Sequence, residues 1–517
     1  MNEKDNLSRE QISRVLISVS DKSDIGSLSK FFSEQGIEII STGGTSRAIK
    51  ERGVSVVPVE NVTSFPEMMN GRVKTLHPLI FGGILGRESD KEEMSNYNIG
   101  KIDMVICNLY PFKSAADKGV DLDSLIEEID IGGPSLLRAA SKNHTRVSVV
   151  TDPADYNWIM EEIKKGGLTL EQRRQLALKS FRHTAEYDSI IQDVLGQRFG
   201  EEDLPSSLHI TGLGSPPLRY GENPHQSSVF YSDLLHSAPS AANSLQLQGK
   251  QLSYNNLLDF DAALAIVMEF EDPTAVIVKH NNPCGVASSI NLLNAFSDAM
   301  STDPESSFGG IISFNQEVDA SLAESITSSF KEGIIAPSYT TEALEIFSSK
   351  ENLRILEVGN LEDYHRSNSL RSLDGGWLLQ EVDEACISVS DCNVVTKRKP
   401  TDEELEGMDF GWKVVKHVKS NAILFTDRKR TVGIGAGQMS RIDSVKIATF
   451  KSIPNPKGTV MSSDAFFPFR DGIDEAANVG VTAVIQPGGS VRDKEVIEAA
   501  NEHNMAMLFT GMRHFKH

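Results

Sequence analysis

The chain carries several glycine-rich and basic loops whose residues could bind phosphate and transfer protons. One of them, STGGTSRAI (41–49), lies where a strand is expected to end and a helix to begin. The backbone N–H groups of Gly43, Gly44 and Thr45 could there bind an anion, for which phosphate is the natural choice. A plain glycine turn, with Thr45 or Ser46 as the helix N-cap, explains this loop equally well.

Two further loops in the same part of the chain add positive charge. RVKTLHP (72–78) includes Lys74 and shows no helical or alternating period, although solvated charge is the commoner explanation of a basic loop. IDIGGPSLLRAASKNH (129–144) places Asp130 and a Gly-Gly-Pro entry before a helix that ends near Lys142. A lysine there ordinarily complements the helix dipole. Three such loops in one α/β segment favour a common anion site.

The second half of the chain holds an adjacent cation and imidazole in KHNNPCG (279–285). Lys279 and His280 suit charge stabilisation and proton transfer near neutral pH, at the carboxyl end of an expected strand. A lone histidine at a strand end is more often a hydrogen-bonded structural residue. The stretch also resembles the P-C-x-x-C motif of zinc deaminases, but no second cysteine follows Cys284 at that spacing, which disfavours catalytic zinc.

Two later motifs could surround a flat ring system. GIGAGQMSR (433–441) resembles a dinucleotide loop, but it has G-x-G-x-G in place of G-x-G-x-x-G and lacks the usual βαβ context, so a dinucleotide is disfavoured. SSDAFFPFRD (462–471) places Asp464, Arg470 and Asp471 around three phenylalanines. This composition suits a heteroaromatic ligand with polar edges, although an ordinary core cluster is favoured when the motif is taken alone.

An alternation of strands and helices must position these loops. In the first 200 residues, apolar β-branched runs alternate with amphipathic stretches, which predicts a parallel sheet covered on both faces. The expected strands are 15–20, 37–41, 104–109 and 146–151, and a long helix is expected from 170 to about 195. Residues 200–217 contain nine Gly, Pro or Ser among eighteen residues, a composition typical of a linker.

Beyond residue 217 the alternation of strands and helices resumes. Eight strands are expected, at 275–280, 310–314, 333–337, 353–358, 422–427, 459–463, 481–487 and 506–510. Eight strands are many for one sheet, so two packed α/β subdomains are expected, dividing near 370–400. The sequence shows no fixed-period repeat, and any duplication is therefore architectural.

The overall composition restricts the class of protein. The 517 residues include 51 Lys and Arg against 72 Asp and Glu, which gives a formal net charge of −21. This excess of negative charge argues against a general nucleic-acid or membrane binder, because such proteins need a basic face. Four cysteines without a C-x-x-C pair argue against a disulfide scaffold. The charged N-terminus and the lack of a long apolar run predict a cytoplasmic protein.

Taken together, the motifs resemble those of one enzyme family. It is the family of bifunctional purine-biosynthesis enzymes that combine phosphoribosylaminoimidazolecarboxamide formyltransferase with IMP cyclohydrolase. The motifs follow the family order from about residue 14 to the last residue: SVSDK (18–22), STGGT (41–45), GRVKTLHP (71–78), CNLYPF (107–112), IDIGG (129–133), LLRAASKNH (136–144), LRYGENPHQ (218–226), KHNNPCG (279–285), SSFGG (306–310), GIIAP (333–337), GIGAGQMSR (433–441) and SSDAFFPFRD (462–471). Their number and order make chance similarity negligible.

The resemblance implies an α/β protein with a methylglyoxal-synthase-like, parallel-sheet cyclohydrolase domain over residues 1–199 and a linker over 200–217. It implies a formyltransferase over 218–517, built from two cytidine-deaminase-like α/β subdomains. The family acts as a homodimer whose formyltransferase site is shared between subunits. The implied partners are small molecules: the aminoimidazole carboxamide ribonucleotide, 10-formyltetrahydrofolate as co-substrate, and IMP. Neither reaction calls for a metal or a redox cofactor, and neither nucleic acid nor membrane is an expected partner.

For formyl transfer, the resemblance implies that the 5-amino group of the ribonucleotide attacks the formyl carbon of the folate. His280 would be the general base, Lys279 the stabilising cation and Asn421 a polar orienting group. Glu332 departs from the family, which often has Asp at this position. The ribonucleotide-binding residues would be Arg219, Tyr220, Gly309, Glu332 and Arg441, and the folate-binding residues would be Ile442, Phe466, Asp471, Ser490, Val491 and Arg513.

For ring closure, the resemblance implies that the carboxamide nitrogen attacks the new formyl group and water is lost. Lys142 would be the leading proton donor or acceptor. Lys74, Tyr110 and Asp130 would polarise the carbonyl and the amide. The nucleotide pocket would be formed by Ser20, Asp21, Lys22, Thr42, Gly43, Gly44, Thr45, Arg72, Val73, Thr75, Cys107, Asn108 and Ile131.

Two alternative functions stay open on the sequence alone. A non-catalytic nucleotide sensor would need only phosphate and ribose contacts. The joint presence of Lys142, Lys279, His280 and Asn421 argues against it. A dinucleotide-dependent dehydrogenase would produce changes in nicotinamide absorbance and would be protected by NAD(P).

Overall fold

The computed structural model describes residues 9–69, 72–200, 204–453 and 455–517. The chain divides into two compact units, Met1–Thr211 and Gly212–His517. The first eight residues, Gly71 of the GRVKTLHP motif and residues 201–203 of the expected linker lie outside the described residues.

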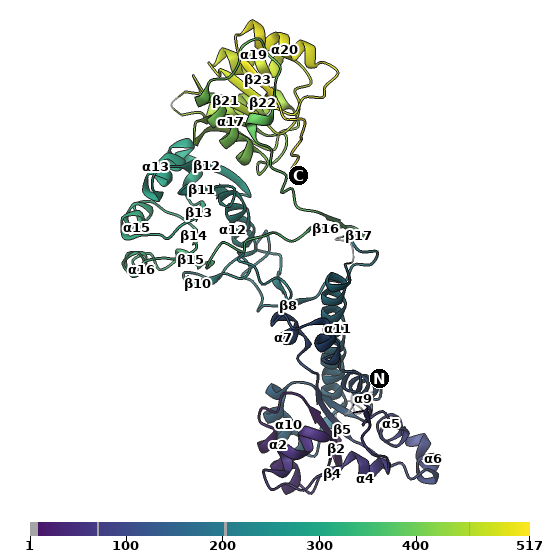
Figure 1. The fold of residues 1–517 in the computed structure, drawn as a ribbon. Coiled ribbons are helices and arrows are strands. Elements are labelled where there is room, and N and C mark those ends of the chain that lie inside the picture. Colours follow the sequence, from purple (N-terminus) through teal and green to yellow (C-terminus); the bar gives the residue numbers. More distant parts are fainter. Residues whose placement is uncertain (1–8, 70–71, 201–203, 454) are drawn as a thin grey trace. The chain divides into compact units, whose positions relative to one another are not determined.

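The first unit is built around five parallel strands in the order β4-β3-β2-β5-β6 (Figure 1). Their bounds are β2 (Arg14–Val19), β3 (Glu38–Ser41), β4 (Val57–Pro58), β5 (Met104–Asn108) and β6 (Ser148–Val150). Successive residues of the central strand, Val15, Leu16 and Ile17, are all fully buried, so both faces of the sheet are covered. The four strands expected from the sequence are confirmed, and the short β4 extends one edge.

Helices connect these strands and pack against them. They are α2 (Ile25–Glu34), α3 (Gly43–Lys50), α4 (Val59–Thr63), α5 (Pro78–Leu85), α6 (Lys91–Asn96), α7 (Phe112–Asp117), α8 (Leu122–Glu127), α9 (Gly132–Lys142), α10 (Tyr156–Lys164) and α11 (Leu170–Phe199), and the short strands β1 (Arg9–Glu10) and β7 (Leu168–Thr169) pair with each other. The long helix α11 begins with a capping box between Thr169 and Gln172 and ends at Gly200, which is left-handed with φ 75°. Within the described residues, no helix has both the length and the apolar character needed to cross a membrane.

The second unit contains one twelve-stranded mixed sheet in the order β10-β15-β14-β13-β11-β12-β20-β19-β21-β22-β23-β18. The strands are β10 (Leu245–Gln248), β11 (Thr274–Lys279), β12 (Asn282–Ser288), β13 (Ile311–Phe314), β14 (Gly333–Ala336), β15 (Arg354–Glu357), β18 (Asn393–Val394), β19 (Ile423–Asp427), β20 (Arg430–Gly435), β21 (Val460–Ser463), β22 (Ala483–Gln486) and β23 (Ala506–Phe509). All eight strands expected from the sequence are confirmed. The expectation that eight strands exceed one sheet is wrong, because β12 and β20, which lie in stretches interpreted as loops, pair at Ala287 and Arg430 and join the strands into one sheet.

This sheet has an internal symmetry that the sequence does not show. From the central β12/β20 pair, the order runs β12-β11-β13-β14-β15 on one side and β20-β19-β21-β22-β23 on the other. Each side begins with an antiparallel hairpin, adds a further antiparallel strand and ends with two parallel strands. The first half thus spans 245–357 and the second half 393–509.

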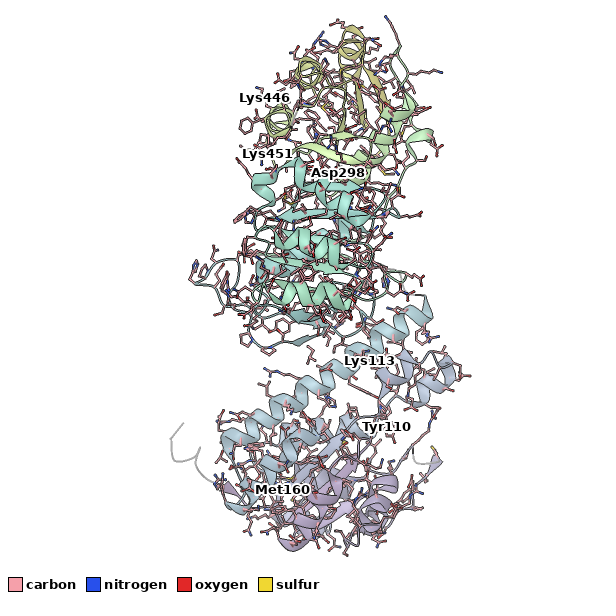
Figure 2. All side chains as sticks on the ribbon, turned by 90° about the vertical axis from the view of Figure 1, so that its left-hand side faces the viewer. Tyr110, Lys113, Met160, Asp298, Lys446 and Lys451 are labelled. Carbon is pink, nitrogen blue, oxygen red and sulfur yellow. The ribbon has the colours of Figure 1, made fainter. Side chains whose placement is uncertain are left out.

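The helices of the second unit cover both faces of the sheet (Figure 1). They are α12 (Tyr254–Val267), α13 (Leu292–Thr302), α14 (Pro304–Ser307), α15 (Ala320–Thr327), α16 (Thr341–Ser348), α17 (Asp402–Val415), α18 (Arg441–Lys451), α19 (Asp471–Asn478) and α20 (Asp493–Glu502). Residues of α12 and α17 share one apolar core that continues across both halves, whereas each half has its own core on the other face. Figure 2 labels Asp298 of the first half and Lys451 of the second half where the halves meet.

Two exposed ribbons complete the second unit. The strands β8 (Gly212–Gly214) and β9 (Tyr231–Asp233) form one ribbon, and β16 (Ser369–Leu373) and β17 (Gly376–Gln380) form the other. The second ribbon exposes Trp377 by 64% and Leu378 by 56%. An isolated two-stranded ribbon is marginally stable in water, so these apolar side chains are candidates for an interface.

Candidate functional sites

The first unit has a cavity of about 770 Å³ at the carboxyl ends of β2, β3 and β5. Loops that follow parallel strands meet at this edge, which is where open α/β sheets bind their ligands. The cavity brings together thirteen of the seventeen residues predicted for this site: Ser20, Lys22, Thr42, Gly44, Thr45, Arg72, Val73, Lys74, Thr75, Asn108, Tyr110, Asp130 and Ile131. Asp21, Gly43, Cys107 and Lys142 are not among its lining residues.

One end of this cavity has the features of an anion site. Helix α3 begins at Gly43, which is left-handed with φ 39°. A Cβ atom at Gly43 would lie 4.0 Å from Nζ of Lys74, and one at Gly44 would lie 3.8 Å from Cε of Lys22. Two ammonium groups thus converge on the free N–H groups of a helix N-terminus, an arrangement that favours phosphate.

Two of the predicted polar residues that line the cavity also order the backbone at this end. The Thr45 hydroxyl donates to Val19 O at 2.9 Å and accepts from Val19 N at 3.1 Å. The Asn108 Oδ1 atom accepts from the backbone N of Ser20 at 2.6 Å and of Asp21 at 2.9 Å. These bonds fix the loop that carries Lys22.

The other end of the cavity presents a half-buried acid, Asp130. Asp130 Oδ1 accepts a 2.8 Å hydrogen bond from Gly133 N at the start of α9. Burial raises the pKa of Asp130, although Gly133 and Lys74 act in the opposite direction. The Cys107 thiol lies near this acid and is itself buried, which raises its pKa far above the ordinary value. Asp130 is therefore the carboxyl in this pocket best suited to carry a proton.

Lys142 lies away from this cavity. It is the last residue of α9 and is exposed, whereas Gly132 and Gly133 at the other end of the helix line the cavity. Eleven residues at 1.5 Å per residue separate the helix ends by about 15 Å. The predicted role of Lys142 therefore stays a prediction, and the geometry favours Lys74 as the lysine of the site.

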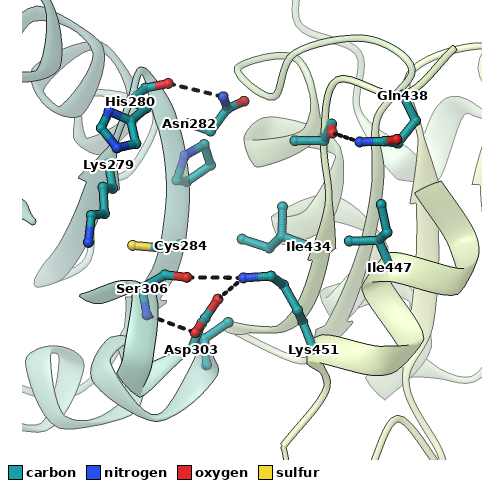
Figure 3. A pocket seen from close by; sticks show the side chains of 13 residues that line it. Lys279, His280, Asn282, Cys284, Asp303, Ser306, Ile434, Gln438, Ile447 and Lys451 are labelled. Carbon is teal, nitrogen blue, oxygen red and sulfur yellow. Dashed lines mark hydrogen bonds and ion pairs between the residues drawn. The ribbon is translucent and has the colours of Figure 1, made fainter. Parts of the chain in front are cut away.

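The second unit has a cavity of about 320 Å³ between its halves, lined by Lys279 and His280 (Figure 3). In this view Asn282 and Cys284 of β12 face Ile434 of β20 across the cavity. Lys451 of α18 donates hydrogen bonds to Asp303 Oδ2 and, at 3.0 Å, to Ser306 Oγ, which links the two halves. The cavity lining also includes Pro283, Thr302, Ala436, Gln438 and Ile447.

His280 lies in a tight hairpin turn. β11 ends at Lys279 and β12 begins at Asn282, so His280 and Asn281 form a two-residue loop with φ of 53° and 61°. Two consecutive left-handed residues are the mark of a type I′ turn, and such a backbone at a histidine is often found at functional sites. The turn presents the exposed imidazole at the cavity.

Neighbouring groups support this turn. Lys279 Nζ donates to Phe308 O at 2.8 Å, and Asn281 N donates to Asp259 Oδ1 at 2.7 Å. Burial raises the pKa of Asp259, while the nearby His280 acts to lower it. Asp259 is not predicted from the sequence, because nothing in the pattern of α12 distinguishes it from a solvated charge.

Asn421 belongs to a buried polar network beside this cavity. Its Nδ2 donates to Gln438 O at 2.9 Å, and Gln438 lines the cavity. Its Oδ1 accepts from Arg441 NH2 at 2.8 Å. Arg441 is 7% exposed and pairs with the fully buried Asp464.

The remaining residues predicted for formyl transfer do not line this cavity. Arg219 stacks on the Tyr220 ring at 4.7 Å and is exposed. Glu332 forms a 2.6 Å ion pair with Arg354. The other predicted residues outside the cavity lining are Asn421, Gly309, Arg441, Ile442, Phe466, Asp471, Ser490, Val491 and Arg513. Within the part of the chain that the structure describes, no group of three His, Cys, Asp or Glu is placed to hold a metal ion.

Comparison with known proteins identifies the family. The profile of the AICARFT/IMPCHase bienzyme matches residues 140–451, and that of the MGS-like domain matches residues 24–135. The "Bifunctional purine biosynthesis protein PurH" of Persephonella marina is 48% identical over 98% of this chain and 99% of its own, and the protein of the same name from Bacillus subtilis is 48% identical over 98% and 100%. A solved structure titled "Crystal structure of ForH" is 34% identical over 35% of this chain and 96% of its own, with a TM-score of 0.32. With these two profiles and two full-length relatives, the chain belongs to the AICARFT/IMPCHase bienzyme family.

Proposed function

We propose that the two cavities divide the two reactions of this family between them. The chain is a bifunctional AICAR formyltransferase and IMP cyclohydrolase, which carries out the final steps of de novo IMP synthesis. In the proposed division, the cavity of the second unit transfers the formyl group and the cavity of the first unit closes the ring. The observation that supports it best is the separation of the basic motifs: Lys22 and Lys74 line one cavity, and Lys279 and His280 line the other.

In the formyl-transfer step, His280 accepts a proton from the 5-amino group of AICAR as that nitrogen attacks the formyl carbon. The bond between the formyl carbon and N10 of the folate then breaks, and N10 takes up a proton. Lys279 stabilises the negative charge that develops on the formyl oxygen. Asn421, held by Arg441 and Gln438, orients the substrate amide. The free, exposed imidazole of the type I′ turn supports His280 as the base.

In the ring-closing step, the phosphate binds at the N-terminus of α3 between Lys22 and Lys74. The carboxamide nitrogen attacks the formyl carbon of the same molecule, so the reaction depends mainly on positioning. The attacking nitrogen loses one proton, and the formamide nitrogen loses another as it forms a double bond to the former formyl carbon. The formyl oxygen takes up these two hydrogens and leaves as water. The raised pKa of Asp130 suits it to donate a proton to that oxygen, and Lys74 polarises the same oxygen.

We further propose that the enzyme is a cytoplasmic homodimer whose formyl-transfer site is completed by the partner. The exposed Arg219 and the half-buried Tyr220 lie in the segment between β8 and β9, and the β16/β17 ribbon exposes Trp377. A second copy could bury these groups and supply ribonucleotide or folate contacts. The matching strand order of the two halves of the sheet also supports two cytidine-deaminase-like subdomains. Dilution from micromolar to nanomolar should lower the formyl-transfer rate per chain while cyclisation is unaffected; equal rates at both concentrations would contradict the shared site.

The direct test supplies AICAR and 10-formyltetrahydrofolate and measures IMP by chromatography. IMP should appear only when both substrates are present. A separate reaction with the formylated ribonucleotide should produce IMP without folate. Binding of AICAR without any product would instead support a nucleotide sensor.

A further inference from the structure

The C-terminal tail, residues 510–517, packs beside α17 and next to Asn421 in the second unit. The His514 ring contacts the Trp412 ring at 5.0 Å, and Figure 1 marks the C-terminus beside α17. Arg371 NH2 donates to the carbonyl of His517 at 2.6 Å. The tail is therefore anchored at several points.

We propose that this tail is a positioning element of the formyl-transfer site, in which Lys516 holds the segment that carries Asn421. The inference rests on the role of Asn421 in the proposed function. Lys516 does not line the cavity. In this proposal it orients Asn421 from the C-terminal tail.

The tail and the Asn421 segment are joined by reciprocal hydrogen bonds. Ser420 N donates to Lys516 O at 2.9 Å, and Lys516 N donates to Ser420 Oγ at 3.0 Å. The Nζ atom of Lys516 donates to His417 O at 3.1 Å. One residue of the tail thus binds both ends of the segment 417–420, and Asn421 follows directly.

A second path connects the tail to Asn421 through buried charges. Ser420 Oγ donates to Asp464 Oδ2 at 2.5 Å, and Asp464 Oδ1 accepts from Arg441. Arg441 NH2 in turn donates to Asn421 Oδ1. Asp464 is fully buried, so loss of one bond leaves a charge that water does not reach. A buried network whose polar groups are hydrogen-bonded in this way is rigid, which restrains the Asn421 amide.

The ammonium group of Lys516 stands in an unusual place for a lysine. Lys516 is half-buried, and its Nζ atom bonds a backbone carbonyl rather than a carboxylate. Burial lowers the pKa of Lys516 to about 8, with Arg366 and Lys419 acting in the same direction and Asp261 against it. Its hydrogen bond to the His417 carbonyl, together with this partial withdrawal from water, indicates a structural task for the side chain.

The test compares Lys516→Ala, Lys516→Arg and the matched control Lys446→Ala, an exposed lysine on α18 (Figure 2). For Lys516→Ala we expect kcat of formyl transfer to fall about tenfold with a smaller change in the KM for AICAR, because an orienting group acts mainly in the transition state. Lys516→Arg should recover most of this loss, and Lys446→Ala should resemble the unchanged protein. Cyclisation of supplied formylated ribonucleotide should stay unchanged in all three.

An unchanged kcat in Lys516→Ala would overturn the proposal, and so would a tenfold loss that Lys516→Arg fails to recover. If Lys516→Ala does not fold, Ser420→Ala replaces it, because it removes the bonds of the hydroxyl to Lys516 N and Asp464. Equal kcat for folded Ser420→Ala and the unchanged protein would then refute the proposal. If the unchanged protein makes no formylated product, the proposed function fails instead, so the two failures are distinguishable.

Discussion

The two cavities differ in how completely a single chain builds them. In the first unit, thirteen of seventeen predicted residues line one cavity, whereas only Lys279 and His280 of the fourteen predicted for formyl transfer line the other. The first cavity lies where parallel strands of one sheet end, and consecutive loops meet there by topology. The second lies between two halves of a mixed sheet, and several of its predicted residues are exposed elsewhere in the unit. Ring closure is therefore expected to be self-contained, and formyl transfer is expected to depend on long-range positioning.

The largest effect that would separate the two sites is expected from His280→Ala. Loss of a general base should lower formyl transfer by about 10²–10⁴-fold. Cyclisation of supplied formylated ribonucleotide should stay within twofold, because its proposed residues belong to the other unit. Both rates are measured on one preparation, with His503→Ala, a surface histidine paired with Asp474, as the control. If both activities fall together in folded His280→Ala, the two-site assignment is wrong.

The next effect concerns the two lysines of the ring-closing site. Lys74→Ala should lower cyclisation by about 100-fold or more, because Lys74 lines the cavity at the start of α3. Lys142→Ala should change it far less, since Lys142 is exposed at the far end of α9. Steady-state cyclisation of the formylated ribonucleotide measures both. If Lys142→Ala instead lowers cyclisation more than Lys74→Ala does, Lys142 has the role that the family resemblance implies.

Much of the fold follows from the sequence because local apolar patterns determine it. All twelve expected strands are present, since short runs rich in β-branched residues, such as RVLISV and AVIVK, are typical of strands buried on both faces. The strands β12 and β20 are missed because their glycines, Gly285, Gly433 and Gly435, resemble loop residues. A Cβ at each of these positions would lie within 2.2 Å of a backbone oxygen of α13 or α18, so the glycines permit close helix packing instead.

Most of the predicted residues that the structure brings together in one cavity come from contiguous motifs. Loops such as GRVKTLHP can be recognised in sequence, and the sheet brings them together. Asp303 and Asp259 are missed because their contacts are distant in sequence: Asp303 meets Lys451, 148 residues away. In sequence, Asp303 before Pro304 indicates only a helix N-cap, and it does cap α14.

A smaller effect is expected from the link between the halves. The Asp303–Lys451 pair is partly buried, with side chains 14% and 39% exposed. It should contribute about 1 kcal/mol to the free energy of unfolding of the second unit. Asp303→Asn and Lys451→Met should each lower kcat/KM of formyl transfer by about fivefold, because the spacing across the cavity relaxes. Cyclisation should not change. A double variant that loses no more than either single variant would show that the two residues act through one interaction; additive losses would contradict the link.

The smallest effect concerns how acid lowers the stability of the second unit. His417 is 6% exposed and bonds Glu269 at 2.8 Å, and burial lowers its pKa to about 4. The unfolded histidine titrates near about 6.5, so below that pH the unfolded state gains the proton first. Its contribution to the stability of the second unit is therefore complete above about pH 6.5 and is lost as the pH falls towards 4. In His417→Gln the stability of the second unit should fall less between pH 7 and pH 5 than in the unchanged protein. The control His503→Gln should behave like the unchanged protein. The midpoint of urea unfolding measures the stability at each pH. Parallel loss of stability in His417→Gln and the unchanged protein would assign the acid sensitivity of the second unit to other groups.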